Sequence, residues 1–317
     1  MHNNVVLGID TSNYTTSVAA VTADGELLFN LKQLLEVKPG ERGLRQSDAL
    51  FSHTVNLPVH FEKARELLTG YNVVAVGVSA KPRDARGSYM PCFLAGVSAS
   101  VAVASTLGVP LYKLSHQSGH IMAALFSSGR YDLLGKEFCA FHVSGGTTEI
   151  LRVIPDVSGF KVECVGGSID AHAGQIVDRI GVHMGLPFPA GAHLEKFALK
   201  NDLKIPRKKL SVHGLDANLS GLENMALELY AKTGDKALTA AFVFDFIGRT
   251  LTALSDAYTE KYGTSTFVYS GGVMCNSIIR RMLGEGREAC FAEPAMSSDN
   301  AVGIAALALE KYKSGER

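Results

Sequence analysis

The chain has 317 residues with 31 Lys or Arg and 31 Asp or Glu, so its formal net charge is zero. The length predicts two domains, and the neutral balance argues against strong free-standing binding of nucleic acid, which needs a basic field. Val5–Ile9 is too short for a signal peptide, no stretch approaches the length of a membrane span, and the five scattered cysteines lack a CxxC pair. We therefore expect a cytoplasmic protein with reduced thiols and no membrane partner.

The first half of the chain alternates strands with helices. The apolar run Val5–Asp10 predicts a buried strand that ends in an acid, and a polar turn over 11–16 leads to a second strand, Ser17–Val21. Asp24-Gly25 then predicts a hairpin turn into Leu27–Phe29. Further along we expect a helix over 47–68, a strand over 73–79, a helix over 95–107, a strand over 109–114 and a helix that opens with His116.

Near the middle the opening pattern recurs. Phe138–Val143 predicts a strand, Ser144–Thr148 a turn and Glu149–Ile154 a return strand. Strand, hydroxyl-rich turn and strand thus occur once in each half, which favours a duplicated α/β fold with two lobes. Two unrelated hairpins are the alternative. A helix is expected over 169–179, with Asp170 as a helix N-cap, and the polar stretch 200–209 is expected to be an insertion loop.

Two histidines and a distant aspartate form the candidate metal site. His116 and His120 are four residues apart, so on a helix they face the same side. An acid from elsewhere in the chain, here Asp299, can complete a facial site with open positions. A helical histidine pair is more often a surface or capping feature than a metal site, so this pair alone is weak evidence.

Glycine- and hydroxyl-rich turns give a second kind of candidate site. Thr11-Ser12 and Ser144–Thr147 can expose backbone N–H groups to phosphate oxygens. Later, a strand over 267–270 is followed by Gly271-Gly272 and a helix that begins at Asn276, an arrangement that can hold a ribose or phosphate. A single such turn is usually only a tight turn, but three with strand context favour a nucleotide site.

Two acids are candidates beside these turns. Asp10 ends the first strand and can hold a hydrated metal or orient a phosphate, or else cap the following turn. Asp178 can accept hydrogen bonds from ribose hydroxyls, or else pair with Arg179 or with solvent. Gly191 closes the Pro/Gly loop 185–191 and could let a ligand approach the backbone.

In combination these segments resemble the TsaD (Gcp-like) family of tRNA threonylcarbamoyltransferases, formerly called O-sialoglycoprotein endopeptidases. The resemblance covers nearly the whole chain. It rests on motifs in the family's order, which are Asp10–Ser12, Ser115–His120, Val143–Thr148, Gly166–Arg179, Gly185–Gly191, Leu219–Leu222, Ser270–Asn276 and Ser298–Asn300. It implies the two-lobed actin-like/Hsp70-like ATPase fold, built from duplicated ribonuclease H-like domains around a central cleft. The expected lobes are 1–134 and 135–298, with a helix over about 299–317 packing back on the first.

The resemblance also implies the site residues. One iron or zinc ion per chain, divalent or trivalent, would be held by His116, His120 and Asp299, with Asp10 and Ser12 as catalytic residues. ATP or an adenylate, with Mg²⁺, would occupy the second site. Its contacts by matching position are His142, Val143, Ser144, Gly145, Gly146, Asp178, Gly191 and Asn276.

The implied reaction transfers a threonylcarbamoyl group from threonylcarbamoyl-adenylate to the exocyclic amine of the tRNA adenosine beside the anticodon, with help from the metal. The implied partners are a small TsaB-like paralogue and a P-loop ATPase. The helices over 49–68 and 95–107 are candidate docking faces, or else parts of the core.

The chain departs from the family pattern in several places. Thr15 stands where the family has an acid, Thr147 where it has a histidine and Glu223 where it has a lysine, and the glycine-rich segment after the third strand is here the charged stretch 81–87. These changes indicate a divergent paralogue. Two further hypotheses therefore stay open: a non-catalytic subunit that binds nucleotide and metal, and a carbamoyl-type transferase with another acceptor, such as a small-molecule amine. The peptidase label is disfavoured, because the His116–His120 pair lacks the glutamate of a His-Glu-x-x-His protease.

Overall fold

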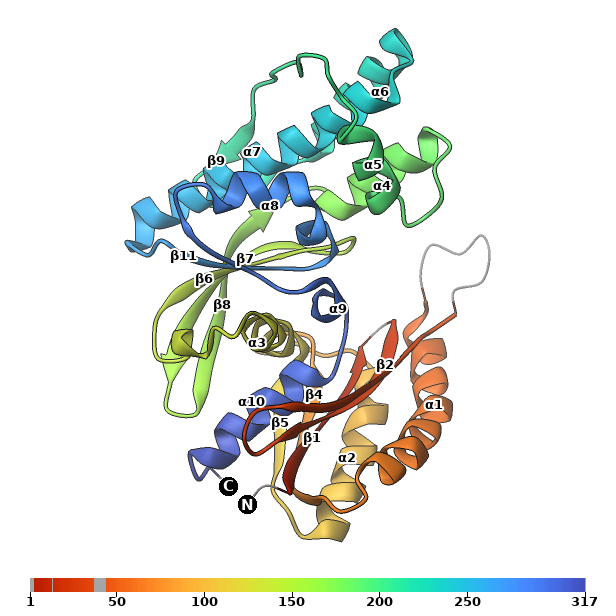
Figure 1. The fold of residues 1–317 in the computed structure, drawn as a ribbon, viewed down its shortest axis with the longest axis vertical. Coiled ribbons are helices and arrows are strands. Elements are labelled where there is room, and N and C mark those ends of the chain that lie inside the picture. Colours follow the sequence, from red (N-terminus) through yellow and green to blue (C-terminus); the bar gives the residue numbers. More distant parts are fainter. Residues whose placement is uncertain (1–2, 13, 37–43, 317) are drawn as a thin grey trace. The chain divides into compact units, whose positions relative to one another are not determined.

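The computed structural model describes residues 3–12, 14–36 and 44–316. Within this part the chain divides into two compact units, one made of 1–135, 155–162 and 298–317 and the other of 136–154 and 163–297 (Figure 1). The expected division placed 155–162 in the second lobe, whereas this hairpin tip groups with the first unit. Asn13 of the predicted turn, and residues 1–2, lie outside the described residues.

The first unit is built on a five-stranded sheet with the order β3-β2-β1-β4-β5. Strands β1 and β2 pair antiparallel, while β1, β4 and β5 run parallel. The strands are β1 (Asn4–Ser12), β2 (Thr15–Thr22), β3 (Leu27–Leu34), β4 (Asn72–Lys81) and β5 (Leu111–Ser115). The predicted strands are confirmed. The turn after β1 is shorter than expected, because Thr11, Ser12, Thr15 and Thr16 continue the ladder.

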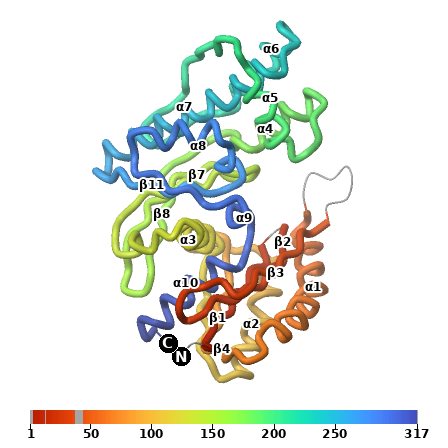
Figure 2. The backbone as a smooth tube through the Cα atoms, viewed as in Figure 1, coloured from red at the N-terminus to blue at the C-terminus, as the bar shows by residue number. Residues whose placement is uncertain are grey.

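Helices cover both faces of this sheet. On one face, α1 (Gln46–Leu67) and α2 (Phe93–Leu107) pack on Ile9 and its buried apolar neighbours. On the other face, α10 (Val302–Lys313) lies directly on the backbone, because a Cβ on Gly8 or Gly77 would collide with it. A fourth helix of this unit, α3 (His116–Ser128), packs beside α10. Figure 2 shows how the C-terminal helix returns to the strands that open the chain.

The second unit repeats this topology. Its sheet has the order β12-β11-β6-β7-β8-β10-β9, so β8-β7-β6-β11-β12 corresponds to β3-β2-β1-β4-β5 of the first unit. The pairing directions also match, since β6 and β7 are antiparallel and β6, β11 and β12 are parallel. The duplicated fold is thereby confirmed. The strands are β6 (Phe138–Val143), β7 (Thr148–Asp156), β8 (Gly159–Ser168), β9 (Ser211–His213), β10 (Asp216–Asn218), β11 (Thr266–Ser270) and β12 (Glu288–Phe291).

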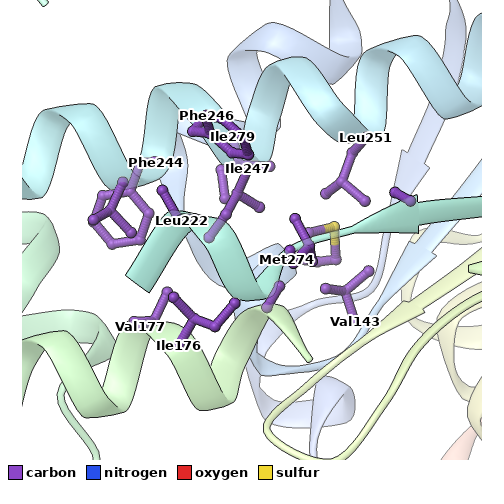
Figure 3. Packing of buried hydrophobic residues seen from close by; sticks show 14 of the residues in the cluster. Val143, Ile176, Val177, Leu222, Phe244, Phe246, Ile247, Leu251, Met274 and Ile279 are labelled. Atoms are coloured by element: carbon purple, nitrogen blue, oxygen red, sulfur yellow. The ribbon is translucent and has the colours of Figure 1, made fainter. Parts of the chain in front are cut away.

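Aromatic rings and one long helix form the core of the second unit. Tyr269 stacks on Phe141 and Phe291 with ring centroids 5.2 and 5.0 Å apart. Apolar residues of helices α4, α6, α7 and α8 pack together in the same core cluster (Figure 3). The helices are α4 (Ala173–His183), α5 (Gly191–Ala198), α6 (Ser220–Thr233), α7 (Lys236–Tyr262), α8 (Ser277–Gly284) and α9 (Pro294–Ser297), with a short 3-10 helix η2 (Gly272–Cys275) after β11.

Helix α7 corrects one expectation. By length and composition α7 could cross a membrane. The prediction that no stretch of the chain approaches the length of a membrane span is therefore wrong. Most of its apolar stretch is buried inside the second unit, where Phe242, Phe246 and Ile247 join the core. A buried core helix passes the same test as a membrane span, so this is weak evidence for a membrane.

Candidate metal and nucleotide sites

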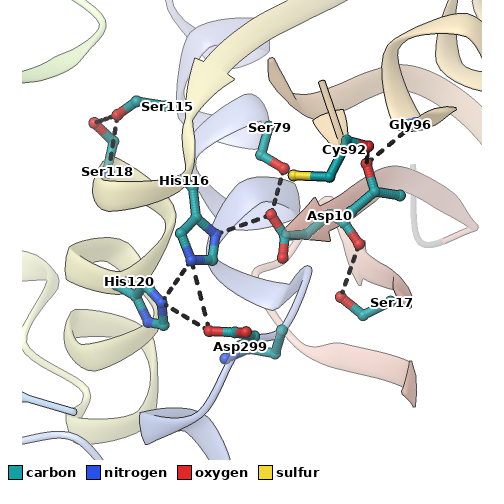
Figure 4. Close-up of polar contacts among 12 residues, drawn as sticks. Asp10, Ser17, Ser79, Cys92, Gly96, Ser115, His116, Ser118, His120 and Asp299 are labelled. Atoms are coloured by element: carbon teal, nitrogen blue, oxygen red, sulfur yellow. Dashed lines mark hydrogen bonds and ion pairs between the residues drawn. The ribbon is translucent and has the colours of Figure 1, made fainter. Parts of the chain in front are cut away.

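Helix α3 begins where its capping residue puts it. The Ser115 hydroxyl accepts a hydrogen bond from the Ser118 amide at 3.0 Å, so His116 is the first helical residue. His120 follows one turn later, and both rings lie on the side of α3 that faces Asp299 (Figure 4). The sequence-based prediction of a helix opening at this pair is confirmed.

The three predicted metal ligands converge. His116 Nε2 and His120 Nε2 are 3.0 Å apart, and Asp299 Oδ1 lies 3.3 Å from His120 Nε2 and 3.6 Å from His116 Nε2. All three ligand atoms lie within 4.8 Å of one another. Two facing imidazole nitrogens at this distance need a proton or a cation between them, because their lone pairs otherwise repel. All three residues belong to the first unit.

Asp10 holds the first histidine from behind. His116 Nδ1 donates to Asp10 Oδ1 at 3.0 Å, and the Ser79 hydroxyl donates to the same oxygen (Figure 4). Asp10 is fully buried, and its second oxygen, Oδ2, has no hydrogen-bond partner among the residues that the structure describes. A carboxylate behind a histidine fixes its tautomer and directs Nε2 toward the ligand position. In this geometry Asp10 is a positioning residue of the triad.

The charges in this cluster favour a cation at its centre. Burial alone would lower the pKa of His116, but Asp10 and Asp299 outweigh it and raise the pKa to about 10. Burial would raise the pKa of Asp299, yet the two histidines hold it well below its ordinary value. Without an ion, a protonated His116 therefore lies between two carboxylates. A metal ion would replace that proton with its own positive charge.

The donor set fits the metal that the resemblance implies. Two imidazoles and one carboxylate suit iron or zinc and leave positions open for a substrate, and the Asp10–His116 bond supplies the outer support such sites need.

Close packing of two helices positions Asp299. A Cβ on Gly303 of α10 would lie 1.9 Å from the Gly119 carbonyl oxygen of α3, so the helices touch backbone to backbone. Asn300 fixes the preceding turn, because its amide donates to the Ser298 carbonyl at 2.7 Å and its Oδ1 accepts from the Val302 amide. This turn carries Asp299 toward the two histidines.

Sequence reasoning missed two polar groups beside the triad. One is Ser79 at the end of β4, which donates to Asp10. The other is Lys32 on β3, whose Nζ donates to the Ser298 hydroxyl at 2.7 Å, and whose pKa is lowered by burial against the opposing effect of Asp299 and Asp10. Sheet order and helix packing bring Ser79 to Asp10 and Lys32 to Ser298. The predicted catalytic residue Ser12 is buried, and its hydroxyl has no hydrogen-bond partner among the described residues.

Glycines bring the candidate nucleotide turns together in the second unit. The turn at Ser144 closes with a hydrogen bond from its amide to the Thr147 carbonyl at 2.7 Å, and a Cβ on Gly145 or Gly146 would meet nothing within 4 Å. Behind this turn, Gly174 at the start of α4 lies against the Ser144 carbonyl. The turn therefore follows the carboxyl end of β6 with its glycines open, where nucleotides bind in such sheets.

Asn276 has a free amide in the same region. Its Oδ1 caps α8 by accepting from the amides of Ile278 and Ile279, while its buried Nδ2 has no partner in the described part of the chain. Gly271, at the end of β11, adopts φ +97° and lies against the Val143 carbonyl, so this crossing admits no side chain. An unsatisfied buried donor is costly, and a nucleotide acceptor would satisfy it.

The other predicted nucleotide contacts differ in what they can offer. Asp178 accepts from the Ala190 amide at 2.8 Å, and burial raises its pKa. Arg179 pairs instead with Glu223, at 3.1 Å. A Cβ on Gly191 would make one ordinary contact, with Val177 Cγ1 at 3.8 Å. The Val143 side chain points into the core (Figure 3), so Val143 can contact a ligand only through its backbone, and His142 is half-buried at the end of the same strand.

Asp170 is a capping residue, but of a different helix from the one predicted over 169–179. Helix α4 begins later, at Ala173, and Asp170 accepts from the backbone amides of Leu219 and Ser220 at the start of α6. The prediction failed here because a cap can act on a helix far away in the chain, about which sequence spacing says nothing.

Solved structures share this fold. Full-length HypF in its phosphate- and nucleotide-bound form matches with a TM-score of 0.62 at 13% identity, over 100% of this chain and 47% of that one, so the chain spans about half of HypF. A ROK family glucokinase from Streptomyces griseus, solved with glucose and AMPPNP, matches with a TM-score of 0.53 at 17% identity, over 96% of this chain and 99% of that one. The chain is therefore a member of the actin-like ATPase fold class.

Sequence comparison gives the family. Residues 26–306 match the family described as TsaD, tRNA N6-adenosine threonylcarbamoyltransferase, and the chain belongs to that family of transferases. Proteins named tRNA N6-adenosine threonylcarbamoyltransferase are similar to it in Streptococcus suis (30% identity over 98% of this chain and 94% of the relative) and Christiangramia forsetii (27% over 97% and 93%). A third, in Methanopyrus kandleri, is 25% identical over 98% and 88%.

Proposed function

We propose that this protein transfers a threonylcarbamoyl group from threonylcarbamoyl-adenylate to the exocyclic amine of the tRNA adenosine beside the anticodon. The observation that carries the proposal is the convergence of His116, His120 and Asp299 behind a buried Asp10. It accompanies membership of a family named for this reaction.

The metal would be held by His116, His120 and Asp299. When bound it would supply Lewis acidity toward the carbonyl of the group being transferred. Asp10 would keep His116 in the correct tautomer through the bond to Nδ1, and Ser79 would hold Asp10 in turn. Lys32 lies next to Ser298 and would attract the negative oxygens of the substrate.

The adenylate would bind in the second unit. The open backbone of Ser144–Gly146 would hold phosphate oxygens through N–H groups, and Asn276 Nδ2 would donate to the nucleoside. Fixing the adenylate next to the attacking amine would supply much of the acceleration, because orientation removes the entropic cost of the encounter.

One departure from the family pattern is offset by an ion pair. Glu223 stands where the family has a lysine, and it pairs with Arg179 at 3.1 Å. The added acid is thus partly neutralised, which limits the repulsion it would exert on phosphates. Thr147 and Thr15 have no such compensation. These two positions favour the alternative, a non-catalytic subunit that binds nucleotide and metal, and the reconstitution experiment below distinguishes it from the transferase.

The partners belong to the same proposal. Phe51, Val55 and Val59 are exposed and follow one another at four-residue spacing, so they form an apolar stripe on α1. We assign this stripe to docking of the small TsaB-like paralogue, with a P-loop ATPase as the further subunit. Replacing Phe51 and Val55 by glutamate should abolish co-purification with that paralogue and leave metal content unchanged.

Free cysteines throughout the described chain fit a reducing cytoplasm.

The test is reconstitution with labelled threonine. The purified protein is incubated with threonine, bicarbonate, ATP, the adenylate-forming synthase, the partner subunits and unmodified tRNA, and the label is followed into RNA. We expect incorporation that requires this chain and that is lost in a His116→Ala/His120→Ala variant but kept in a His193→Ala control. If the label stays out of RNA while nucleotide and metal remain bound, the proposal is wrong. A different acceptor or a non-catalytic role then takes its place.

A further inference from the structure

One short stretch of the second unit departs from the neutral charge of the chain. Residues 196–209, here called the cationic segment, contain six Lys or Arg and one Asp, a net charge of +5 in a chain whose total is zero. The segment begins in α5 and continues through the irregular stretch before β9 (Figure 1). The cations are Lys196, Lys200, Lys204, Arg207, Lys208 and Lys209, and all six are exposed.

These cations are left unpaired by the fold. None of the six forms an ion pair with another described residue, whereas Arg179 and Arg249 of the same unit pair with Glu223 and Asp245. The charged loop after β4 is different, because Lys81 pairs with Asp84, which also accepts from the Ser115 and Ser118 hydroxyls. Positive potential is therefore greater at the cationic segment, with its net charge of +5, than at the loop 81–87, where three cations accompany one acid.

The backbone of the cationic segment is anchored. Arg249 donates to the Lys208 carbonyl at 3.2 Å, and Asn201 donates to the Leu203 carbonyl at 2.8 Å. Ile205 and Leu210 pack against the core of the second unit. The charged side chains thus project from a fixed base, which reduces the entropy lost when they bind a partner.

An aromatic ring lies among the charges. Lys200 Nζ and Lys236 Nζ are 5.9 and 5.8 Å from the centroid of Phe197, within the range of cation–π contacts. A cationic surface with an interleaved ring is typical of proteins that track a nucleic-acid backbone. An anionic membrane would instead favour an amphipathic helix with cations along one face, and most of this segment is not helical.

We propose that the cationic segment binds the phosphodiester backbone of the RNA substrate. This inference rests on the proposed function, which supplies an RNA substrate. Lysine ammoniums act as point charges on phosphates, so the contact would give affinity and orientation without reading sequence. The choice of the target adenosine would then be made elsewhere.

The test is tRNA binding by the full-length protein, measured by fluorescence anisotropy across a salt series. A Lys204→Gln/Lys208→Gln/Lys209→Gln variant removes three of the charges. A Lys113→Gln/Lys161→Gln/Lys313→Gln variant removes three exposed lysines of the first unit as the matched control. Each lost phosphate contact reduces the magnitude of the slope of log K against log salt by about 0.7–0.9. The slope of the first variant should therefore be smaller by about 2, and the variant should bind tRNA at least about 10-fold more weakly at 0.1 M salt.

Several outcomes overturn the proposal. These are an unchanged affinity and slope in the first variant, an equal loss in the control, failure of the wild type to bind tRNA, or loss of binding to anionic vesicles while tRNA binding is kept. Binding is measured without turnover, so the result of this test does not depend on whether the protein carries out the proposed reaction. If the wild type transfers nothing to tRNA but the first variant still loses tRNA binding, the surface assignment stands and the transfer reaction does not.

Discussion

Replacing Gly303 with alanine is expected to release the metal and to destabilise the first unit. The new Cβ would lie 1.9 Å from the Gly119 carbonyl oxygen and 2.6 Å from the Ala123 amide nitrogen. Both are backbone atoms, so no side-chain rotation relieves the collision. Helix α10 must move by about 1 Å to restore the 3.0 Å below which Cβ atoms essentially never approach another atom.

That movement is large compared with what a metal site tolerates. Asp299 lies just before α10 in the chain. The other two candidate ligands of the ion, His116 and His120, are on α3. Metal–ligand distances are held within about 0.2 Å, so a 1 Å displacement should weaken metal binding by at least about 10-fold. Overpacking of this kind costs about 1–3 kcal/mol, and each kcal/mol lowers the melting temperature of a domain of this size by about 2–4 °C.

The assay is metal content per chain after dialysis against a weak chelator, together with thermal unfolding by circular dichroism. Gly284→Ala in α8 is the control, because its Cβ would meet nothing within 4 Å. Gly119→Ala should have a milder effect, since its Cβ meets only side-chain atoms of Ile304 at close range. A Gly303→Ala variant that keeps both the metal and the melting temperature of the wild type would refute the assignment of Asp299 positioning to this helix contact.

Three further predictions concern single sites. His116→Ala with His120→Ala should remove the metal measured by mass spectrometry, while His193→Ala should not; unchanged metal content in the double variant would mean that the site is misplaced. Asn276→Ser keeps a helix-capping oxygen but removes the free Nδ2, so calorimetry should give about 10-fold weaker adenine-nucleotide binding at unchanged stability, and equal binding would dismiss that contact. Asp170 has a lowered pKa, because hydrogen bonds from Ser220 and nearby amides outweigh the effect of burial. Its stabilising effect is therefore fully present above about pH 4 and is lost progressively as the pH falls through the lowered pKa of the folded state. Asp170→Asn should thus lower the urea midpoint at pH 7 and by a smaller but still clear amount at pH 3, and an equal difference at both would contradict this account.

Local patterns carried most of the fold prediction. Buried strands such as β1 and β6 appear in the sequence as apolar runs that end in small polar residues, and the capping residues Ser115 and Asn276 mark where α3 and α8 begin. The repeat of the strand–turn–strand pattern indicated the duplication, and the sheet orders bear it out. Strand β8 was missed because its burial is mixed and its Gly166-Gly167 pair does not suggest a strand.

The candidate site was harder to predict because its parts meet only through the fold. The histidine pair could be found from its spacing, but nothing in the sequence links it to Ser79 or Lys32, which reach Asp10 and Ser298 through sheet order and helix packing. The unpaired charges of the cationic segment are likewise visible only once the ion pairs of the second unit are known. Net charge alone pointed away from nucleic acid, because it averages over both units.

The metal ligands come from chain positions that are far apart. His116 and Asp299 are separated by more than half of the chain, so a bound ion would act as a removable cross-link that closes a very long loop. An ion that binds only the folded state stabilises it by about 2.7 kcal/mol at 100 times its dissociation constant. The melting temperature of the first unit would then rise with ion concentration, and the order in which different metals raise it would rank their affinities without any need for turnover.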